Sequence, residues 1–562
     1  MVKSVLAAAL FASAVGQVVA ADAPPSLTLT IMPTMKDSVV TDVAIHMTQQ
    51  APQIAAGQSL LTMPIELVST PTAAYQARDI SAKDAQGVLT LTAEEMPADP
   101  SGQYRRYFAD RATVGDVTYE YHTPPRAVDA STRNGPLFDL RTQQQGVMGA
   151  GVYFLALPAE GQPFSVTLKW DLSKMPSASR GVSSYGENTL NTVMPAEALR
   201  FAYYAAGQLQ QWPKGNNSNF TMYWLDKPPF DMAQLAPQTQ TFYRYMANFF
   251  GDKRDYRVFA RSNPYPAGGG TGLAHSFMFG YGSEGQTIAE GVQVLLAHEM
   301  AHTWPKLNSS ESHAQTAWYT EGTAEYYAIL MSLRAGISDP KEFLRQINLR
   351  AAAYYANPYV KLTNHDAGEL FWKDARAQKV PYGRGFMYLF DLNQRLQQAS
   401  NGQRSVDDLV LEIYQRQQQG ETIGNTEWQQ IIQRELGEQA VIDFQQMTQG
   451  ALQIPSTTAF GCLDAKAEKY RPFDLGFDEM RLGEVFKLRD ASEAAKAGLK
   501  TGDKIVHITP LAELKADPSK KMAITVKRGE QTLYFSFLPR GAFVDGWQWH
   551  FNERGPAACH FE

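Results

Sequence analysis

Five consecutive residues near the middle of the chain, His298-Glu299-Met300-Ala301-His302, have the types and spacing of a metal-dependent hydrolytic site. The two histidines are four residues apart, so on a helix they share one face and can bind one metal ion. Eighteen residues separate His302 from Glu321. Two imidazoles and one carboxylate form a ligand set that suits zinc and leaves a coordination position open for water. Glu299 can take a proton from that water. The pattern predicts one zinc ion per chain and the hydrolysis of peptide bonds.

The residues around this motif must form helices if the ligands are to converge. Apolar residues at helical spacing precede the motif, and Pro305 marks a stop soon after it. A second helix is expected from about Thr316, and it would present Glu321. Glu325 lies one helical turn further on, where it either orients a zinc-bound histidine or is simply solvated.

Length and composition limit the function classes. A chain of 562 residues predicts several domains, and a hydrophobic content of 44% is ordinary for globular cores. The 51 basic and 57 acidic residues give a net charge of −6 without a long basic run. This balance gives no support for binding nucleic acid.

The first twenty residues have the pattern of a secretory signal peptide. Lys3 precedes the apolar stretch Val5–Val19, and the small residues at 18–20 suit cleavage. The alternative is a membrane anchor, but the apolar run is short and rich in alanine. No later stretch reaches the length of a membrane span. We expect residues 1–20 to be removed and the mature protein to be exported, to the periplasm or the medium.

The chain contains two cysteines, Cys462 and Cys559. In an oxidising compartment they can form one disulfide that attaches the end of the chain to its last domain. The alternative is a pair of free buried thiols.

Two large regions differ in their patterning. Residues 21–195 alternate between polar and apolar types and predict a β-sandwich-like domain. Residues 196–455 are expected to be mostly helical, with a helix at Met232–Gly251 and short strands such as Ser276–Phe279 before the metal helix. That order suits a thermolysin-like catalytic domain with a helical extension. Ser405 is expected to cap one of the later helices.

A third region, residues 456–545, looks like a PDZ domain of the bacterial type, followed by a tail at 546–562. A short helix is expected to end at Gly498, and Thr501–Asp503 turns into a strand at Lys504–Ile508. The whole fold is therefore expected to be multidomain α+β.

The zinc motif and its surroundings resemble a known family. Trp318–Tyr327, which contains Glu321, together with the following PDZ-like region, is similar to the glycyl aminopeptidase family of gluzincins. The resemblance implies an N-terminal β domain, a thermolysin-like catalytic domain and a C-terminal PDZ domain. It also implies an aminopeptidase that acts on small N-terminal residues.

A further segment, Pro381–Phe386, looks like the catalytic tyrosine motif of gluzincin aminopeptidases. The resemblance implies that Tyr382 donates a hydrogen bond to the oxyanion of the tetrahedral intermediate. A neutral phenol can do so without replacing water on the metal. The alternative is a core tyrosine at the start of a helix.

The chain departs from the family at the residue that would bind the substrate's amine. The stretch Gly270–Ser276 corresponds to a glycine-rich substrate-binding strand, but Ala274 stands where the family often has glutamate. A methyl group cannot pair with an ammonium as a carboxylate does. Substrate contacts are expected from Gly272, Ala274 and His275, although His275 could instead be structural. Acidic residues that could replace the missing carboxylate are Glu284, Glu290 and Glu325.

Within the PDZ-like region, Leu475, Gly476 and Phe477 could form a nest for a peptide's C-terminal carboxylate, or be covered by the protein itself. The expected partners are peptide or protein substrates and a PDZ ligand. Two alternatives to an aminopeptidase stay open. One is an endopeptidase or dipeptidase that uses the same metal, and the other is an inactive peptide-binding protein. The presence of Glu299 favours an active enzyme.

Overall fold

The computed structural model describes most of the chain, and the expected signal peptide at residues 1–20 lies outside the described part. Among the helices that it describes, none is both long enough and apolar enough to cross a membrane. The described residues are 23–68, 70–98, 102–130, 132, 135–159, 161–215, 218–264, 269–282, 289–371, 373–479 and 481–561.

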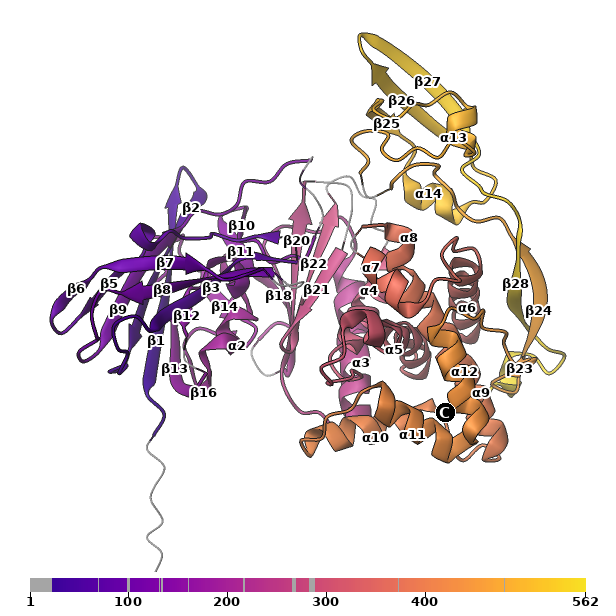
Figure 1. Cartoon of the computed structure of the whole chain (residues 1–562), viewed down its shortest axis with the longest axis horizontal. Coiled ribbons are helices and arrows are strands. Elements are labelled where there is room, and N and C mark those ends of the chain that lie inside the picture. The colour runs from indigo at the N-terminus through magenta and orange to yellow at the C-terminus, as the bar shows by residue number, and fades with distance from the viewer. Residues whose placement is uncertain are drawn as a thin grey trace, which may run out of the picture.

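The N-terminal region is built from β-sheets that share one apolar core, as the alternating pattern predicts (Figure 1). In the first strand Leu27, Leu29 and Ile31 are buried, whereas the residues between them are more exposed. The larger sheet consists, in spatial order, of β16 (Leu190–Pro195), β13 (Pro163–Trp170), β1 (Ser26–Lys36), β2 (Val39–Gln49), β9 (Val117–Thr123), β5 (Ser81–Asp84) and β6 (Gly87–Leu89). The second consists of β12 (Leu157–Pro158), β3 (Ser59–Leu67), β8 (Gly102–Ala109) and β7 (Leu91–Glu95), with β4 (Thr70–Pro71) beside β3.

A third sheet crosses the boundary that the sequence places at residue 195. Its strand β17 (Tyr203–Gly207) lies between two strands from the N-terminal region, so β structure continues where helices were expected. All five residues of β17 are buried, and the strand therefore lacks the polar alternation that marks the earlier ones. The sheet runs β10 (Arg141–Gln143), β11 (Gly146–Ala150), β17, β14 (Arg180–Ser183) and β15 (Gly186–Glu187), with the short helices α1 (Gly151–Phe154) and α2 (Ala196–Arg200) nearby in the chain.

The catalytic region begins with a mixed sheet that supports the metal helix. Its strands β19 (Phe220–Trp224), β20 (Tyr256–Asn263) and β22 (Ser276–Gly282) are parallel to one another. The edge strand β21 (Gly269–Leu273) runs antiparallel to β22. All seven residues of β22 are buried, since helices cover one face of the sheet and residues such as Tyr203 of the third sheet pack on the other. The sheet also contains β18 (Gln210–Trp212).

A buried charged cluster joins this sheet to the N-terminal region. Arg261 of β20 lies 2.5 Å from Asp139, and Arg141 lies 2.7 Å from the same carboxylate. The side chains of Asp139 and Arg261 are each only 1% exposed. Burial by itself would raise the pKa of Asp139, but the two arginines outweigh it and hold that pKa below its ordinary value.

Helices form the rest of the catalytic region (Figure 1). The two central ones, α5 (His313–Arg334) and α9 (Val380–Ala399), approach so closely that a Cβ on Gly322 would lie 2.5 Å from the Cα of Gly385. Ser405 begins a helix through a capping box with Asp408, which confirms the predicted cap. The other helices are α3 (Met232–Phe250), α4 (Ala289–Ala301), α6 (Pro340–Tyr355), α7 (Asn364–Leu370), α8 (Ala375–Gln378), α10 (Val406–Gln418), α11 (Asn425–Leu436) and α12 (Glu438–Thr448).

The C-terminal region is divided differently from the expected 456–545 domain and 546–562 tail. Strands β24 (Leu463–Tyr470) and β28 (Val544–Phe551) pair along their whole lengths, with β23 (Thr458–Ala459) beside them. This sheet packs on α6, and Trp549, which is 1% exposed, belongs to the core of the catalytic region. The expected tail therefore begins within a strand, which continues to Phe551. Its pairing partner lies about eighty residues earlier in the chain, a separation that local patterning does not reveal.

Between β24 and β28 the chain forms a small lobe with a core of its own (Figure 1). The predicted short helix and strand are confirmed as α13 (Glu493–Lys496) and β25 (Lys504–Ile508). Gly498 follows α13 with φ +103°, a left-handed backbone that suits glycine at the end of a helix. The lobe is completed by α14 (Leu511–Ala516), β26 (Met522–Arg528) and β27 (Gln531–Phe537).

Candidate active site

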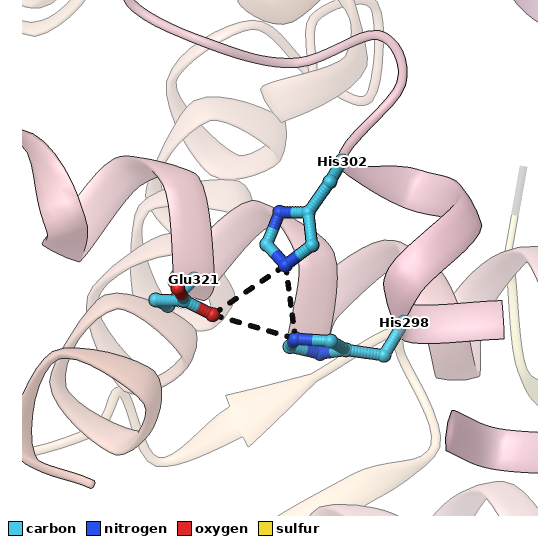
Figure 2. A group of neighbouring side chains, drawn as sticks. All are labelled: His298, His302 and Glu321. Carbon is cyan, nitrogen blue, oxygen red and sulfur yellow. Dashed lines mark hydrogen bonds and ion pairs between the residues drawn. The ribbon is translucent and has the colours of Figure 1, made fainter. Parts of the chain in front are cut away.

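Three side chains converge where α4 meets α5 (Figure 2). The Nε2 atoms of His298 and His302 are 3.1 Å apart, and they lie 3.4 and 3.5 Å from Oε2 of Glu321. Tetrahedral zinc at ~2.0–2.1 Å from nitrogen and oxygen ligands requires separations of about 3.3 Å between those atoms. The triangle of ligand atoms therefore has the dimensions of a zinc site.

The hydrogen bonding of this triangle also fits a cation. Oε2 of Glu321 is buried, and no described donor makes a hydrogen bond of good geometry to it. A buried carboxylate oxygen facing two imidazole nitrogens is costly unless a positive charge lies between them. Zinc bound by His298, His302 and Glu321 would supply that charge.

The pKa values of the ligands follow from burial and from their neighbours. Burial would raise the pKa of Glu321, but His298 and His302 outweigh it and lower that pKa to about 2. Burial lowers the pKa of His302, which favours the neutral ring. For His298 burial acts in the same direction, but Glu325 and Glu321 raise its pKa to about 10. A metal held by His298 would therefore compete with a proton for its ring nitrogen.

Glu325 holds the ring of His298 from the side opposite the ligand atoms. Its Oε1 lies 3.2 Å from Nδ1 of His298, and its Oε2 lies 2.5 Å from Nε of Arg350, which comes from α6. Burial would raise the pKa of Glu325, but Arg350 and His298 keep it well below its ordinary range. A carboxylate that favours its ionised form at Nδ1 leaves Nε2 to face the metal position.

Glu299 comes from the same turn of α4 as the first ligand. Its side chain is partly exposed, and within the described ranges its carboxylate makes no ion pair. Its charge acts on both histidines and on Tyr382. A free carboxylate in this position can accept a proton from water.

Tyr382 lies in the first turn of α9, next to the ligand set. Its ring stacks on that of His298, with ring centroids 5.6 Å apart and an interplanar angle of 7°. Burial, followed by Glu321 and Glu299, raises the pKa of Tyr382 well above its ordinary value. The phenol therefore stays neutral and keeps the proton that an oxyanion donor needs.

Two basic residues at the site were not found from the sequence. Arg350 lies on a helix after Glu325, and no local motif connects the two residues. Lys379 lies over the ring of Tyr382, with its Nζ 4.1 Å from the ring centroid. Its position three residues before Tyr382 at the start of a helix is the signal that could have drawn attention to it.

The edge strand β21 lies against α4, which places it beside the metal helix. Gly272 has open space around its Cα, as expected of a strand that admits a substrate. Ala274 lies in the turn after β21, where its N–H donates to the carbonyl oxygen of Phe201 at 3.3 Å.

His275 and the acidic residues considered for binding the substrate amine lie in different surroundings from Ala274. The carbonyl of His275 accepts the N–H of Arg257 at 3.1 Å, and burial together with Arg254 lowers the pKa of its imidazole. Of the acidic residues considered as amine anchors, Glu284 lies outside the described residues, Glu290 lies on α4, and Glu325 is engaged by His298 and Arg350.

In the C-terminal region, Cys462 and Cys559 form a disulfide with Cα atoms 4.8 Å apart. Leu475 and Phe477 are each 3% exposed and belong to the core of the small lobe. The N–H of Gly476 donates to Oδ1 of Asp474 at 2.9 Å. The carboxylate of Asp474 therefore accepts the N–H of Gly476, which the sequence predicts to bind the C-terminal carboxylate of a peptide.

Residues 292–378 match the sequence model of a family described as M61 glycyl aminopeptidase. The matched segment contains the ligand set, Glu299 and Glu325. Over residues 292–378 the chain is therefore similar to this peptidase family. Among curated proteins, none matches this chain.

Solved structures were found with a similar architecture. An aminopeptidase N family protein from Idiomarina loihiensis aligns with a TM-score of 0.63 at 14% identity, over 95% of this chain and 99% of that chain. An M1 zinc metallopeptidase from Deinococcus radiodurans aligns with a TM-score of 0.44 at 16% identity, over 77% and 95% of the two chains. Native yeast LTA4 hydrolase aligns with a TM-score of 0.44 at 13% identity, over 78% and 69%. The first of these shares the multidomain α+β fold, with a β-rich N-terminal part and a helical part after it.

Proposed function

We propose that this metallopeptidase is an exported zinc aminopeptidase that removes small residues from the N-termini of peptides. The observation that supports it most is the ligand triangle, with atoms 3.1–3.5 Å apart, flanked by Glu299 and Tyr382. The family match at residues 292–378 points to the same reaction class. Export rests on the pattern of residues 1–20 and is supported by the disulfide between Cys462 and Cys559.

Each residue of the site has a defined part in hydrolysis. Zinc held by His298, His302 and Glu321 would polarise the scissile carbonyl and make water more acidic. Glu299 accepts one proton as the water oxygen attacks the carbonyl carbon. The same carboxyl group then gives this proton to the leaving amine as the C–N bond breaks. The hydroxyl of Tyr382 donates a hydrogen bond to the oxyanion while the tetrahedral carbon exists.

The decisive experiment is a digest of a peptide library, read by mass spectrometry, with the parent and Glu299→Gln compared in parallel. The amide has nearly the same shape as the carboxylate but cannot accept the proton. We expect one zinc per chain in both proteins, and a loss of activity of roughly a hundredfold to ten-thousandfold in the variant. Cleavage confined to the first peptide bond supports the aminopeptidase, whereas no cleavage by a zinc-loaded parent contradicts the proposal. That last result would leave a peptide-binding role for the small lobe.

The methyl group of Ala274 favours a second candidate, a zinc endopeptidase or dipeptidase that uses the same site. Without a carboxylate at this position, an N-terminal ammonium loses a charged hydrogen bond. Such a bond in a shielded site affects affinity by roughly tenfold to a hundredfold. The ratio of cleavage efficiencies for free and N-acetylated peptides, in the parent and in Ala274→Glu, separates the candidates. If the parent rejects acetylated peptides completely and the substitution changes nothing, another acidic residue binds the amine.

We further propose that the small lobe is a PDZ domain. Its support is the order of α13, the glycine at 498, the turn and β25, with α14 after them. A peptide carboxylate could enter the loop at Leu475–Phe477 only by displacing Asp474 from the N–H of Gly476. We therefore expect weak binding of peptide C-termini by the parent and tighter binding by Asp474→Ala, measured by titration calorimetry.

A further inference from the structure

The ammonium of Lys379 lies at the catalytic tyrosine without an acidic partner. Its Nζ is 4.1 Å from the centroid of the Tyr382 ring, and the side chain is exposed. Within the described parts of the chain this ammonium forms no ion pair. Its charge nevertheless contributes to lowering the pKa values of Glu321 and Glu325, so it acts on the metal site.

A substrate at this site must pass close to Lys379. The ring of Tyr382 stacks on that of His298, so the phenol has a defined orientation. In the proposed reaction the phenol hydroxyl meets the scissile carbonyl. The ammonium above the same ring then lies within a few ångströms of the substrate. Contact with an aromatic face is electrostatic and leaves N–H donors of the lysine free for an acceptor.

The other charges of the site favour an anionic group beside Lys379. Arg350 already pairs with Glu325, and Glu321 belongs to the ligand triangle. Ala274 presents no carboxylate to a substrate ammonium. The exposed ammonium of Lys379 beside Tyr382 would therefore attract a negatively charged group of a bound peptide.

We propose that Lys379 binds a carboxylate of the peptide substrate close to the scissile bond, and so makes the site selective for peptides that have one there. The carboxylate is either an acidic side chain or the free C-terminus of a short peptide. The inference rests on the proposed peptidase function, because it places the substrate carbonyl at Tyr382.

The test compares four peptides: Ala-Ala-Ala, its C-terminal amide, Ala-Asp-Ala-amide and Ala-Asn-Ala-amide. Values of kcat/KM are measured with the parent, Lys379→Gln, Lys379→Arg and the control Lys373→Gln, which removes an exposed lysine nearby in the chain. We expect Lys379→Gln to reduce cleavage of one carboxylate-bearing peptide by on the order of tenfold and to spare its neutral partner. Lys379→Arg should keep the preference, and Lys373→Gln should behave as the parent. If Ala-Ala-Ala loses cleavage relative to its amide, the carboxylate is the C-terminus. If Ala-Asp-Ala-amide loses cleavage relative to Ala-Asn-Ala-amide, the carboxylate is a side chain.

An equal fall for all four peptides would overturn the proposal, since Lys379 would then only order the ring of Tyr382. No change for any of them would overturn it as well. A second measurement does not depend on cleavage: the Kd values of the same peptides for Glu299→Gln, with and without Lys379→Gln. If the parent cleaves none of the four, the proposed function fails, and the ratio of these Kd values still decides the role of Lys379. The proposal is refuted if Lys379→Gln leaves unchanged the ratio of the Kd values for the acid and amide peptides.

Discussion

Replacing Glu325 by glutamine tests whether a carboxylate outside the ligand set controls zinc binding. The amide keeps the volume of the side chain but removes the charge next to Nδ1 of His298. At the observed separation of 3.2 Å and an effective dielectric constant of about 20, the full interaction of two unit charges would be about 5 kcal/mol. That value is an upper bound, because the amide keeps a partly negative oxygen close to Nδ1. Carboxylates that orient metal-binding histidines typically change metal affinity by about 10- to 100-fold.

We therefore expect Glu325→Gln to weaken zinc binding by about 10- to 100-fold, or about 1.4–2.8 kcal/mol. The assay is competition with a chromophoric chelator at neutral pH. Glu342→Gln is a matched control, because Glu342 also pairs with an arginine, at 2.7 Å, but lies away from the ligands. It should bind zinc as the parent does.

Loss of the partner of Arg350 could also unfold the site, and the design must separate this effect. Removing one member of a buried ion pair costs about 3–5 kcal/mol of stability. Arg350→Met breaks the same pair but leaves the carboxylate at His298, so it should be destabilised and yet retain most of its zinc affinity. A zinc Kd within twofold of the parent in Glu325→Gln would refute the reasoning, as would an equal loss of affinity in both variants.

Further expectations concern turnover, packing, the disulfide and acid stability. Tyr382→Phe should lose on the order of a hundredfold in kcat with little change in zinc content, and near-normal turnover would remove the residue from the mechanism. Gly385→Ala should lower the free energy of unfolding by about 1–3 kcal/mol, since the new methyl group meets the backbone of α5, and unchanged denaturant midpoints would contradict this. Cys462→Ser should be less stable by about 2–5 kcal/mol in oxidising buffer and equal to the parent in reducing buffer. Asp139→Asn should be less stable than the parent by about 3–5 kcal/mol at neutral pH. The pKa of Asp139 is lowered in the folded state, so its ionised carboxylate stabilises the fold above the ordinary carboxyl pKa. This stabilisation is lost as the pH falls through the folded-state pKa. Denaturant unfolding should therefore show a smaller stability difference between the parent and Asp139→Asn in acid.

The sequence by itself predicted the three side chains that converge at the site and the local elements around them. Two histidines four residues apart share a helix face in any helix, and a carboxylate in the next helix completes the ligand set. Short-range signals such as the cap at Ser405 and the glycine at 498 also predicted their elements correctly. These features depend on contacts within a few residues, which periodicity and capping rules describe.

Only the tertiary structure decided how distant segments meet. It pairs β24 with β28 across the small lobe, and it places the wholly buried β17 between strands of the N-terminal region. It also brings Arg350 to Glu325 and Lys379 onto the ring of Tyr382. The physical reason is that such contacts are set by the packing of whole helices and sheets. A side chain's neighbours in space then depend on the summed burial of many residues, which no local pattern records.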